Sequence, residues 1–147
     1  MFKHILIPTD GSPLAKKAID AGVALAKEMG ASVTGYYAIE PVPRHIYGEG
    51  YLANGRFAEE LARRVRDTAQ KSVDEVSAAA RAAGVPCEAV VDQPEQPYKG
   101  IVQAAEQKAC DAVVMASHGY RGITGLLLGS VTQKVLTHSK VPVLVFR

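Results

Sequence analysis

The chain has 147 residues, of which 48% are hydrophobic, and its formal net charge is only +2. This length predicts a single domain, residues 1–147, and the small charge excludes a strong electrostatic case for binding nucleic acid or a membrane surface. No apolar run approaches a membrane span, and the N-terminus lacks the design of a signal peptide. We therefore expect a cytoplasmic protein, in which Cys87 and Cys110 remain free thiols.

The predicted elements alternate between apolar strands and amphipathic helices. Ser12 and Pro13 are typical of a helix start, and Gly30 is a natural end for that first helix. Pro97 opens the third helix in the same way. In chain order, strands are expected at 5–8, 32–39, 87–91, 111–116 and 142–146, with helices at 13–29, 57–83, from Pro97 onward and at 131–138, and a turn-rich loop at 40–55.

This order predicts an α/β fold with a doubly wound, five-stranded parallel sheet, helices on both faces and a Rossmann-like architecture. Right-handed crossovers favour the strand order 3-2-1-4-5, which places the turns after the first and fourth strands side by side. In open α/β sheets, ligands bind beyond the carboxyl ends of the strands at such a point. We therefore expect residues 8–12 and 116–119 to face one crevice.

Glycines punctuate the second of these turns. Gly119 follows the fourth strand, and Gly129 and Ser130 follow nine residues later, at the start of a helix. Glycines let the backbone approach an anion, and a helix N-terminus offers unpaired N–H groups, so this pattern predicts a phosphate site. Ser130 and Gln133 also match a capping box, a reading compatible with the phosphate site. Arg121 is a candidate to close over a phosphate, with an exposed loop arginine as the alternative.

The first turn contains Asp10, which is a candidate to bind ribose hydroxyls or a divalent metal beside the phosphates, with Thr9 next to it. The alternative is an ordinary Asp-Gly turn. His118 is a candidate acid or base, but no carboxylate or nucleophile pairs with it in the sequence, so a role in shaping its turn is the alternative. Residues 48–53 fit the Gly-x-Gly-x-x-Gly/Ala dinucleotide pattern, yet they lie in a loop and fail its context test.

Catalytic signatures are missing from the sequence. It contains neither the P-loop pattern with its phosphate lysine nor a Gly-x-Ser-x-Gly nucleophile elbow. We therefore expect a binding protein rather than an enzyme.

Three segments together resemble the universal stress protein family. They are Ile-Leu-Ile-Pro-Thr-Asp-Gly-Ser at 5–12, Ser-His-Gly at 117–119 with Gly-Ser-Val at 129–131, and the closing Val-Pro-Val-Leu-Val at 141–145. The ATP-binding members carry Gly-x-x-Gly-x9-Gly-Ser/Thr. This chain matches that motif except that Ala116 replaces the first glycine, which adds a methyl group where the backbone passes the ribose.

The resemblance implies ATP or another adenine nucleotide as the ligand, with Mg²⁺ as a candidate partner at Asp10. It also implies a homodimer through the last strand, Val143 to Phe146, which suits an apolar strand at a sheet edge. The implied contacts are Pro8, Thr9 and Asp10 on the adenosine side, Ala38 at the adenine edge, Met115 and Ala116 against the ribose, and Gly119, Gly129, Ser130, Val131 and Thr132 at the phosphates.

Three functions remain open at this point. The first is a cytoplasmic stress-response protein in which the nucleotide acts as a sensor or switch. The second is a dimeric interaction module that works without nucleotide, which the alanine at position 116 favours. The third is a weak ATP hydrolase.

Overall fold

The computed structural model describes residues 1–41, 55–120 and 127–147. The expectations for residues 42–54, including the dinucleotide-like pattern at 48–53, and for Arg121 lie outside the described residues. In chain order the elements are β1 (His4–Pro8), α1 (Pro13–Met29), β2 (Ser32–Ala38), α3 (Gly55–Ala83), β3 (Cys87–Asp92), α4 (Pro97–Gln107), β4 (Ala112–Ala116), α5 (Ser130–His138) and β5 (Val143–Phe146).

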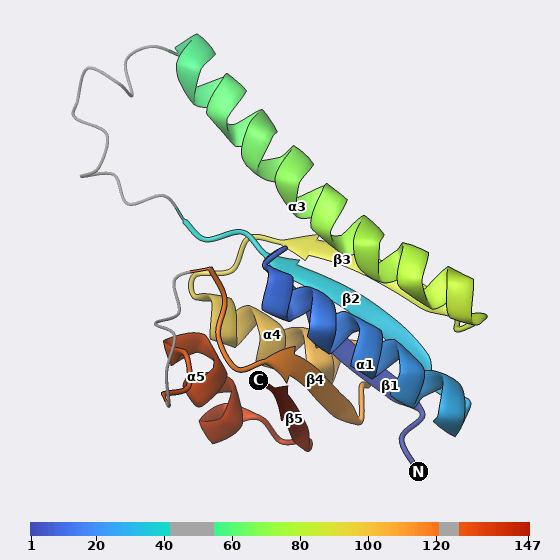
Figure 1. Cartoon of the computed structure of the whole chain (residues 1–147). Coiled ribbons are helices and arrows are strands. Elements are labelled where there is room, and N and C mark those ends of the chain that lie inside the picture. The colour runs from blue at the N-terminus through green and yellow to red at the C-terminus, as the bar shows by residue number, and fades with distance from the viewer. Residues whose placement is uncertain (42–54, 121–126) are drawn as a thin grey trace.

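The five strands form one parallel sheet in the order β3-β2-β1-β4-β5, which confirms the predicted fold class and strand order. Helices α1 and α3 cover one face of the sheet, and α4 and α5 cover the other (Figure 1). Because β1 pairs with both β2 and β4, the turns after β1 and β4 emerge next to each other at the carboxyl edge.

Side chains of β1 alternate between the two faces of the sheet, as the pleat of a strand requires. Ile5 and Ile7 join the core under α1 and α3, whereas Leu6 joins the core under α4 and α5 together with Tyr36. All four side chains are at most 1% exposed. The unbroken apolar run from Ile5 to Pro8 in β1 is therefore explained by cores on both sides.

Helix α1 begins and ends as predicted. The Ser12 hydroxyl accepts a hydrogen bond from the Ala15 N–H at 3.2 Å, and Pro13 is the first helical residue. Gly30 ends the helix in the left-handed conformation, with φ 65°. These caps fix where the turn after β1 joins the helix.

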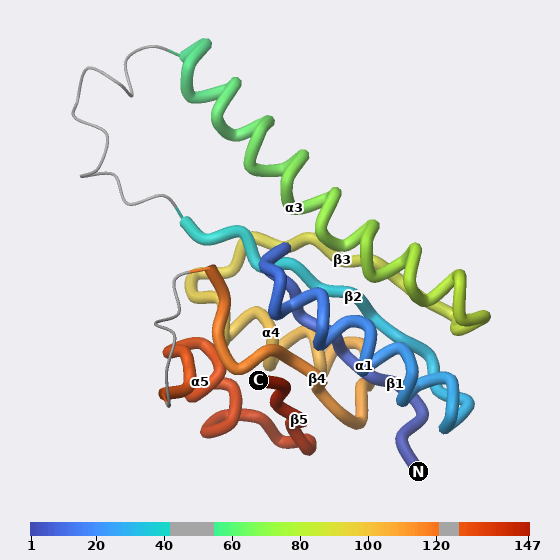
Figure 2. Tube along the Cα trace, viewed as in Figure 1, coloured from blue at the N-terminus to red at the C-terminus, as the bar shows by residue number. Residues whose placement is uncertain are grey.

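Helix α3 is much longer than the part of the sheet face that it covers. Its buried residues all lie between Ala69 and Ala80, and its N-terminal half projects beyond the sheet (Figures 1 and 2). Phe57, in that projecting half, is 41% exposed. At the buried end the helix lies close on β2, because a Cβ built on Gly35 would be 2.9 Å from the Val76 Cβ.

Within the described residues, no helix combines the length and apolarity needed to cross a membrane. Cys87 and Cys110 are both free thiols, as predicted. Burial raises the pKa of the Cys110 thiol to about 11, so this thiol is protonated at neutral pH. It therefore lacks the thiolate that nucleophilic chemistry requires.

Asp111 ties down the N-terminus, and this contact should make stability depend on pH. Its carboxylate accepts hydrogen bonds from the Lys3 N–H at 2.8 Å and the His4 N–H at 3.1 Å. Desolvation raises the pKa of Asp111, but these backbone bonds outweigh it and hold the pKa below the ordinary value of 3.8. The stabilisation is therefore complete above the unfolded pKa, roughly 4, and is lost as the pH falls through the lower folded value.

We expect Asp111→Asn to reduce the free energy of unfolding by about 1 kcal/mol at pH 7, because Asn keeps one acceptor oxygen and loses the charge. Urea unfolding at about pH 7 and pH 3 measures the difference between variant and wild type at each pH. The difference should shrink at the lower pH; an equal difference at both would contradict the role of the ionised carboxylate.

Candidate functional site

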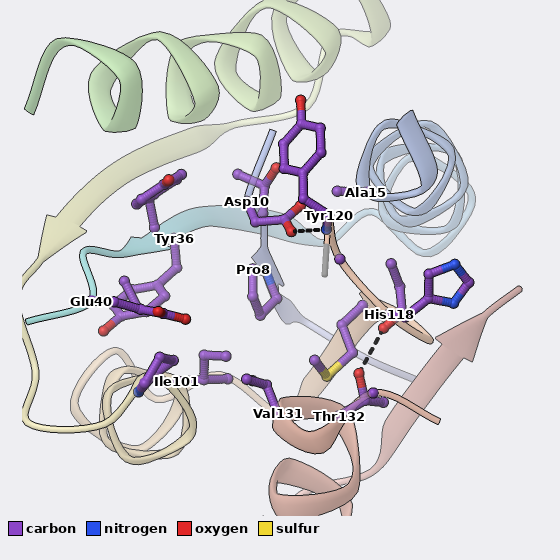
Figure 3. A pocket seen from close by; sticks show the side chains of 18 of the residues that line it. Pro8, Asp10, Ala15, Tyr36, Glu40, Ile101, His118, Tyr120, Val131 and Thr132 are labelled. Carbon is purple, nitrogen blue, oxygen red and sulfur yellow. Dashed lines mark hydrogen bonds between the residues drawn. The ribbon is translucent and has the colours of Figure 1, made fainter. Parts of the chain in front are cut away.

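A cavity of about 490 Å³ lies at the carboxyl edge of the sheet, beyond β1 and β4 (Figure 3). Small-molecule sites range over roughly 300–1,000 Å³, so this cavity has the size for such a ligand. All the predicted site residues that the structure describes line it: Pro8, Thr9, Asp10, Ala38, Met115, Ala116, His118, Gly119, Gly129, Ser130, Val131 and Thr132.

Other lining residues were missed in the sequence. The lining residues at the end of β2 could have been predicted from the sheet order, because the carboxyl end of β2 lies at the same edge of the sheet as that of β1. No local pattern places Val65 here, since that depends on how α3 crosses the sheet. The missed residues are Ala15, Tyr36, Tyr37, Ile39, Glu40, Val65, Pro97, Ile101 and Tyr120.

Helix α5 begins without a side-chain cap, which corrects the predicted capping box. Its N-cap is Gly129, with φ −61° and ψ 151°, and Ser130 is already the first helical residue. Glycine has no oxygen to offer the helix, and the Gln133 side chain donates to the Leu128 carbonyl at 3.0 Å.

The uncapped start leaves backbone donors at the cavity. The first backbone bond of α5 runs from the Gln133 N–H to the Gly129 carbonyl, at 3.0 Å. The N–H groups of Ser130, Val131 and Thr132 therefore have no acceptor within the helix. All three residues line the cavity, so the positive end of the helix dipole lies at its wall.

Gly129 brings α5 close to the turn after β4. Its N–H donates to the Ser117 carbonyl at 2.7 Å. A Cβ at this position would lie 3.2 Å from both the His118 Cα and the Ser117 carbonyl oxygen. These are backbone atoms, so a larger residue would have to push the turn and the helix apart.

Ala116, the departure from the nucleotide-binding motif, fits its place without backbone strain. It is the last residue of β4, where it pairs with Phe146. Its φ is not positive, because Ala109 is the non-glycine residue with positive φ in the described part of the chain. The extra methyl group therefore imposes no left-handed conformation.

Thr132 fastens α5 to β4. Its side chain is 2% exposed, and its hydroxyl donates to the Ala116 carbonyl at 3.0 Å (Figure 3). This buried bond fixes the first turn of α5 against the end of the strand.

We expect Thr132→Val to reduce the free energy of unfolding by about 1–2 kcal/mol, because the substitution removes the donor from a buried carbonyl while nearly preserving side-chain shape. Thermal unfolding measures the loss. Thr137→Val is the matched control on the exposed face of α5, where the hydroxyl donates to the Gln133 carbonyl at 2.9 Å. The control should stay within about 0.5 kcal/mol of wild type, and an equal loss in both variants would refute the argument from burial.

We call residues 9–12 the β1 turn and residues 117–120 the β4 turn. Two hydrogen bonds join them: the Tyr120 N–H donates to Asp10 Oδ2 at 3.0 Å, and the Tyr120 hydroxyl donates to the Gly11 carbonyl at 2.7 Å. The other oxygen of Asp10 accepts from the Ser12 N–H at 2.9 Å. A Cβ on Gly119 would lie 1.9 Å from Asp10 Oδ2, so any larger residue there would displace the Asp10 carboxylate.

The charged side chains among the described lining residues are the carboxylates Asp10 and Glu40, so the positive potential of the cavity comes from backbone dipoles. Among its described lining residues there is neither Lys nor Arg, and His118 is half-buried, with Nδ1 3.1 Å from the Ser117 hydroxyl. Burial, and then the charges of Asp10 and Glu40, raise the pKa of Tyr37, which keeps this phenol neutral. A phosphate here would be held by N–H groups and the helix dipole.

The described part of the chain contains no cluster of three or more His, Cys, Asp or Glu side chains that could hold a metal ion. Asp10 is the one predicted metal ligand, and both of its carboxylate oxygens already accept backbone hydrogen bonds. The described residues therefore do not form a protein-held metal site.

Comparison with known proteins gives a consistent match over the full length. Residues 1–147 match the family described as the universal stress protein family. A universal stress protein of Thermus aquaticus is 37% identical over 148 residues, covering 100% of both chains. The solved structure of a universal stress protein from Methanocaldococcus jannaschii has a TM-score of 0.80 at 28% identity, covering 99% of this chain and 95% of that one.

Some structures of the same fold contain adenine nucleotides. A universal stress protein in complex with cAMP has a TM-score of 0.67 at 24% identity, covering 99% of this chain and 97% of that one. More distant structures of this fold are an Archaeoglobus fulgidus protein with dAMP and an Arabidopsis thaliana protein with AMP, at 17% and 13% identity and TM-scores of 0.67 and 0.68. They cover 100% and 98% of this chain, and it covers 98% and 90% of them.

Proposed function

The chain belongs to the universal stress protein family, and from that premise we propose that it binds ATP or another adenine nucleotide in the cavity beyond β1 and β4. The nucleotide acts as the signal of a sensor or switch rather than as the substrate of a catalyst. The observation that carries this proposal is the uncapped start of α5: its first three residues line a cavity of about 490 Å³, and their N–H groups have no acceptor within the helix. Solved complexes with cAMP, dAMP and AMP support the choice of an adenine nucleotide, since this fold accommodates one.

The proposed ligand lies across the cavity from its apolar part to α5. Its phosphates meet the backbone at Gly119 and Gly129 and the N–H groups that begin α5. The apolar walls suit the base and ribose, which have few charges to desolvate. On this proposal the base and ribose contacts are Pro8, Thr9, Asp10, Ala38, Met115 and Ala116, and the phosphate contacts are His118, Gly119, Gly129, Ser130, Val131 and Thr132, with Arg121 as a further candidate.

We also propose a single-domain cytoplasmic protein that forms a homodimer through β5. This strand lies at the edge of the sheet and pairs with β4 on one side. All four of its residues, Val143 to Phe146, are partly exposed, and an edge strand presents unpaired backbone N–H and C=O groups with which a second copy can pair. The charge of +2 gives no reason to invoke nucleic acid or a membrane as a partner.

Isothermal titration of the full chain with ATP, AMP and cAMP, each with and without Mg²⁺, tests the proposal. We expect saturable heat with at least one of them, and a thermal shift that grows with its concentration. No heat and no shift at millimolar concentration of any of the three would reject nucleotide binding. That result would leave the alternative, a dimeric interaction module that works without nucleotide.

Hydrolysis is the remaining alternative, and the described site offers little for it. His118 has a serine hydroxyl rather than a carboxylate as its neighbour, so nothing orients it as a general base. Phosphate release that survives further purification and falls in Asp10→Ala would support a weak hydrolase instead of a switch.

A further inference from the structure

Tyr120 is absent from the site residues that the sequence predicts, yet it lines the cavity and joins the two turns that line it. Its N–H donates a hydrogen bond to the Asp10 carboxylate, and its hydroxyl donates one to the Gly11 carbonyl. Both acceptors are more than one hundred residues away in the sequence. The side chain is 70% exposed, so hydrophobic burial does not explain its position. Figure 3 shows Tyr120 next to Asp10 at one side of the cavity, with a dashed line for the bond between them.

We infer that Tyr120 is a positioning residue for the nucleotide site, and that Asp10 serves it as a backbone clasp rather than as a metal ligand. The inference rests on the proposed function and assigns these two residues their roles in it. The clasp, defined as Asp10, Gly11 and Tyr120 with their two hydrogen bonds, holds the β1 turn and the β4 turn at a fixed separation. Residues of both turns line the same cavity, so the clasp fixes where the β4 turn lies in its wall.

The packing around Gly119 supports this role. Asp10 Oδ2 occupies the place where a side chain at Gly119 would begin, 1.9 Å from the built Cβ. The clasp therefore draws the Gly119 backbone directly against the β1 turn, which keeps the proposed phosphate contact in place. In a preorganised site of this kind, ordering the loops on binding costs less free energy, so affinity is higher.

The hydrogen bonds of Asp10 also argue against its acting as a ligand of Mg²⁺. One oxygen accepts from the Ser12 N–H and the other from the Tyr120 N–H, so the carboxylate charge is already directed at backbone dipoles. Binding a metal through Asp10 would compete with the clasp. We therefore expect any effect of Mg²⁺ on ATP affinity to come from the phosphates alone, and to be independent of Asp10.

Tyr120→Phe tests the clasp without changing the charge of the site. Loss of the hydroxyl bond to Gly11 should weaken AMP binding about 3- to 10-fold, measured by isothermal titration. Tyr98→Phe is the matched control, because Tyr98 lies on α4 and does not line the cavity. The control should bind AMP as wild type does. Equal affinity in wild type and Tyr120→Phe would overturn the positioning role.

Asp10→Asn tests the role of the carboxylate. The ratio of ATP dissociation constants in EDTA and in Mg²⁺ should be the same for this variant as for wild type, within about 2-fold. A ratio that falls toward 1 only in Asp10→Asn would show that Asp10 is a metal ligand and overturn the assignment. Far-UV circular dichroism of each variant checks that it is folded.

Amide exchange tests the clasp without any ligand. In the free protein, the Tyr120 N–H should exchange about 10-fold more slowly in wild type than in Asp10→Ala, measured by NMR. Equal exchange rates would overturn the clasp. If the clasp protects this amide but wild type binds no nucleotide, the proposed function fails, and with it the role of the clasp in binding.

Discussion

Gly129→Leu is expected to abolish nucleotide binding while the chain remains folded. At φ −61° and ψ 151° the backbone of this residue suits any L-amino acid, so the effect comes from the side chain alone. Its Cβ would lie 3.2 Å from backbone atoms of Ser117 and His118, so the leucine would push the start of α5 away from the β4 turn, and both of these segments line the cavity. We expect affinity to fall at least about 100-fold, roughly 2.7 kcal/mol, measured by isothermal titration with AMP and ATP.

Gly55→Leu provides the matched control for this substitution. A Cβ built on Gly55 meets no atom within 4 Å, and the residue lies at the start of α3 and does not line the cavity. The control should bind nucleotide with wild-type affinity. If Gly129→Leu also retained wild-type affinity, the phosphate site at the start of α5 would be refuted.

Gly35→Val is expected to cause the largest loss of stability among the substitutions considered. Gly35 is in the centre of β2, and a Cβ there would lie 2.9 Å from the Val76 Cβ and 3.0 Å from its Cγ1. Val76 is fully buried and β-branched, so it cannot rotate out of the way. Overpacking of this kind costs about 3 kcal/mol, which should lower the Tm by roughly 6–12 °C.

A substitution at Val76 can show whether its contacts with position 35 cause the loss of stability. In Gly35→Ala combined with Val76→Ala, the smaller residue at position 76 removes two of the three close contacts. The double variant should therefore lose less free energy of unfolding than the sum of the two single variants, measured by urea unfolding. Strict additivity would show that the two Val76 methyl groups do not set the cost, because the Cβ contact at 2.9 Å remains in the double variant.

Much of the fold could be predicted because its signals are local. Apolar strands, Ser12 with Pro13 at one helix start and Gly30 at its end are each recognisable within a few residues. The handedness of crossovers then left one strand order as the best choice, and the structure has that order. The same logic brought the predicted site residues of both turns to one cavity, because the carboxyl ends of parallel strands share an edge.

The capping box shows where local reading fails. Ser130 and Gln133 have the right spacing for it, but the box requires Ser130 to precede the helix. Instead, the Gly129 N–H donates to the Ser117 carbonyl, and the Thr132 hydroxyl donates to the Ala116 carbonyl. Contacts with the end of β4 and the residue after it therefore determine where α5 begins. This one-residue difference leaves the start of α5 without a side-chain cap.

The sequence by itself determined the element order, the sheet and the edge at which the site forms, because hydrophobic period and helix end signals act over a few neighbouring residues. Only the tertiary structure decided how the two turns are joined at the site, and part of its lining. The Tyr120 contacts to Asp10 and Gly11, and the path of α3 that brings Val65 to the cavity, join residues far apart in the chain. Such contacts follow from how whole elements pack, and no spacing within a single segment encodes them.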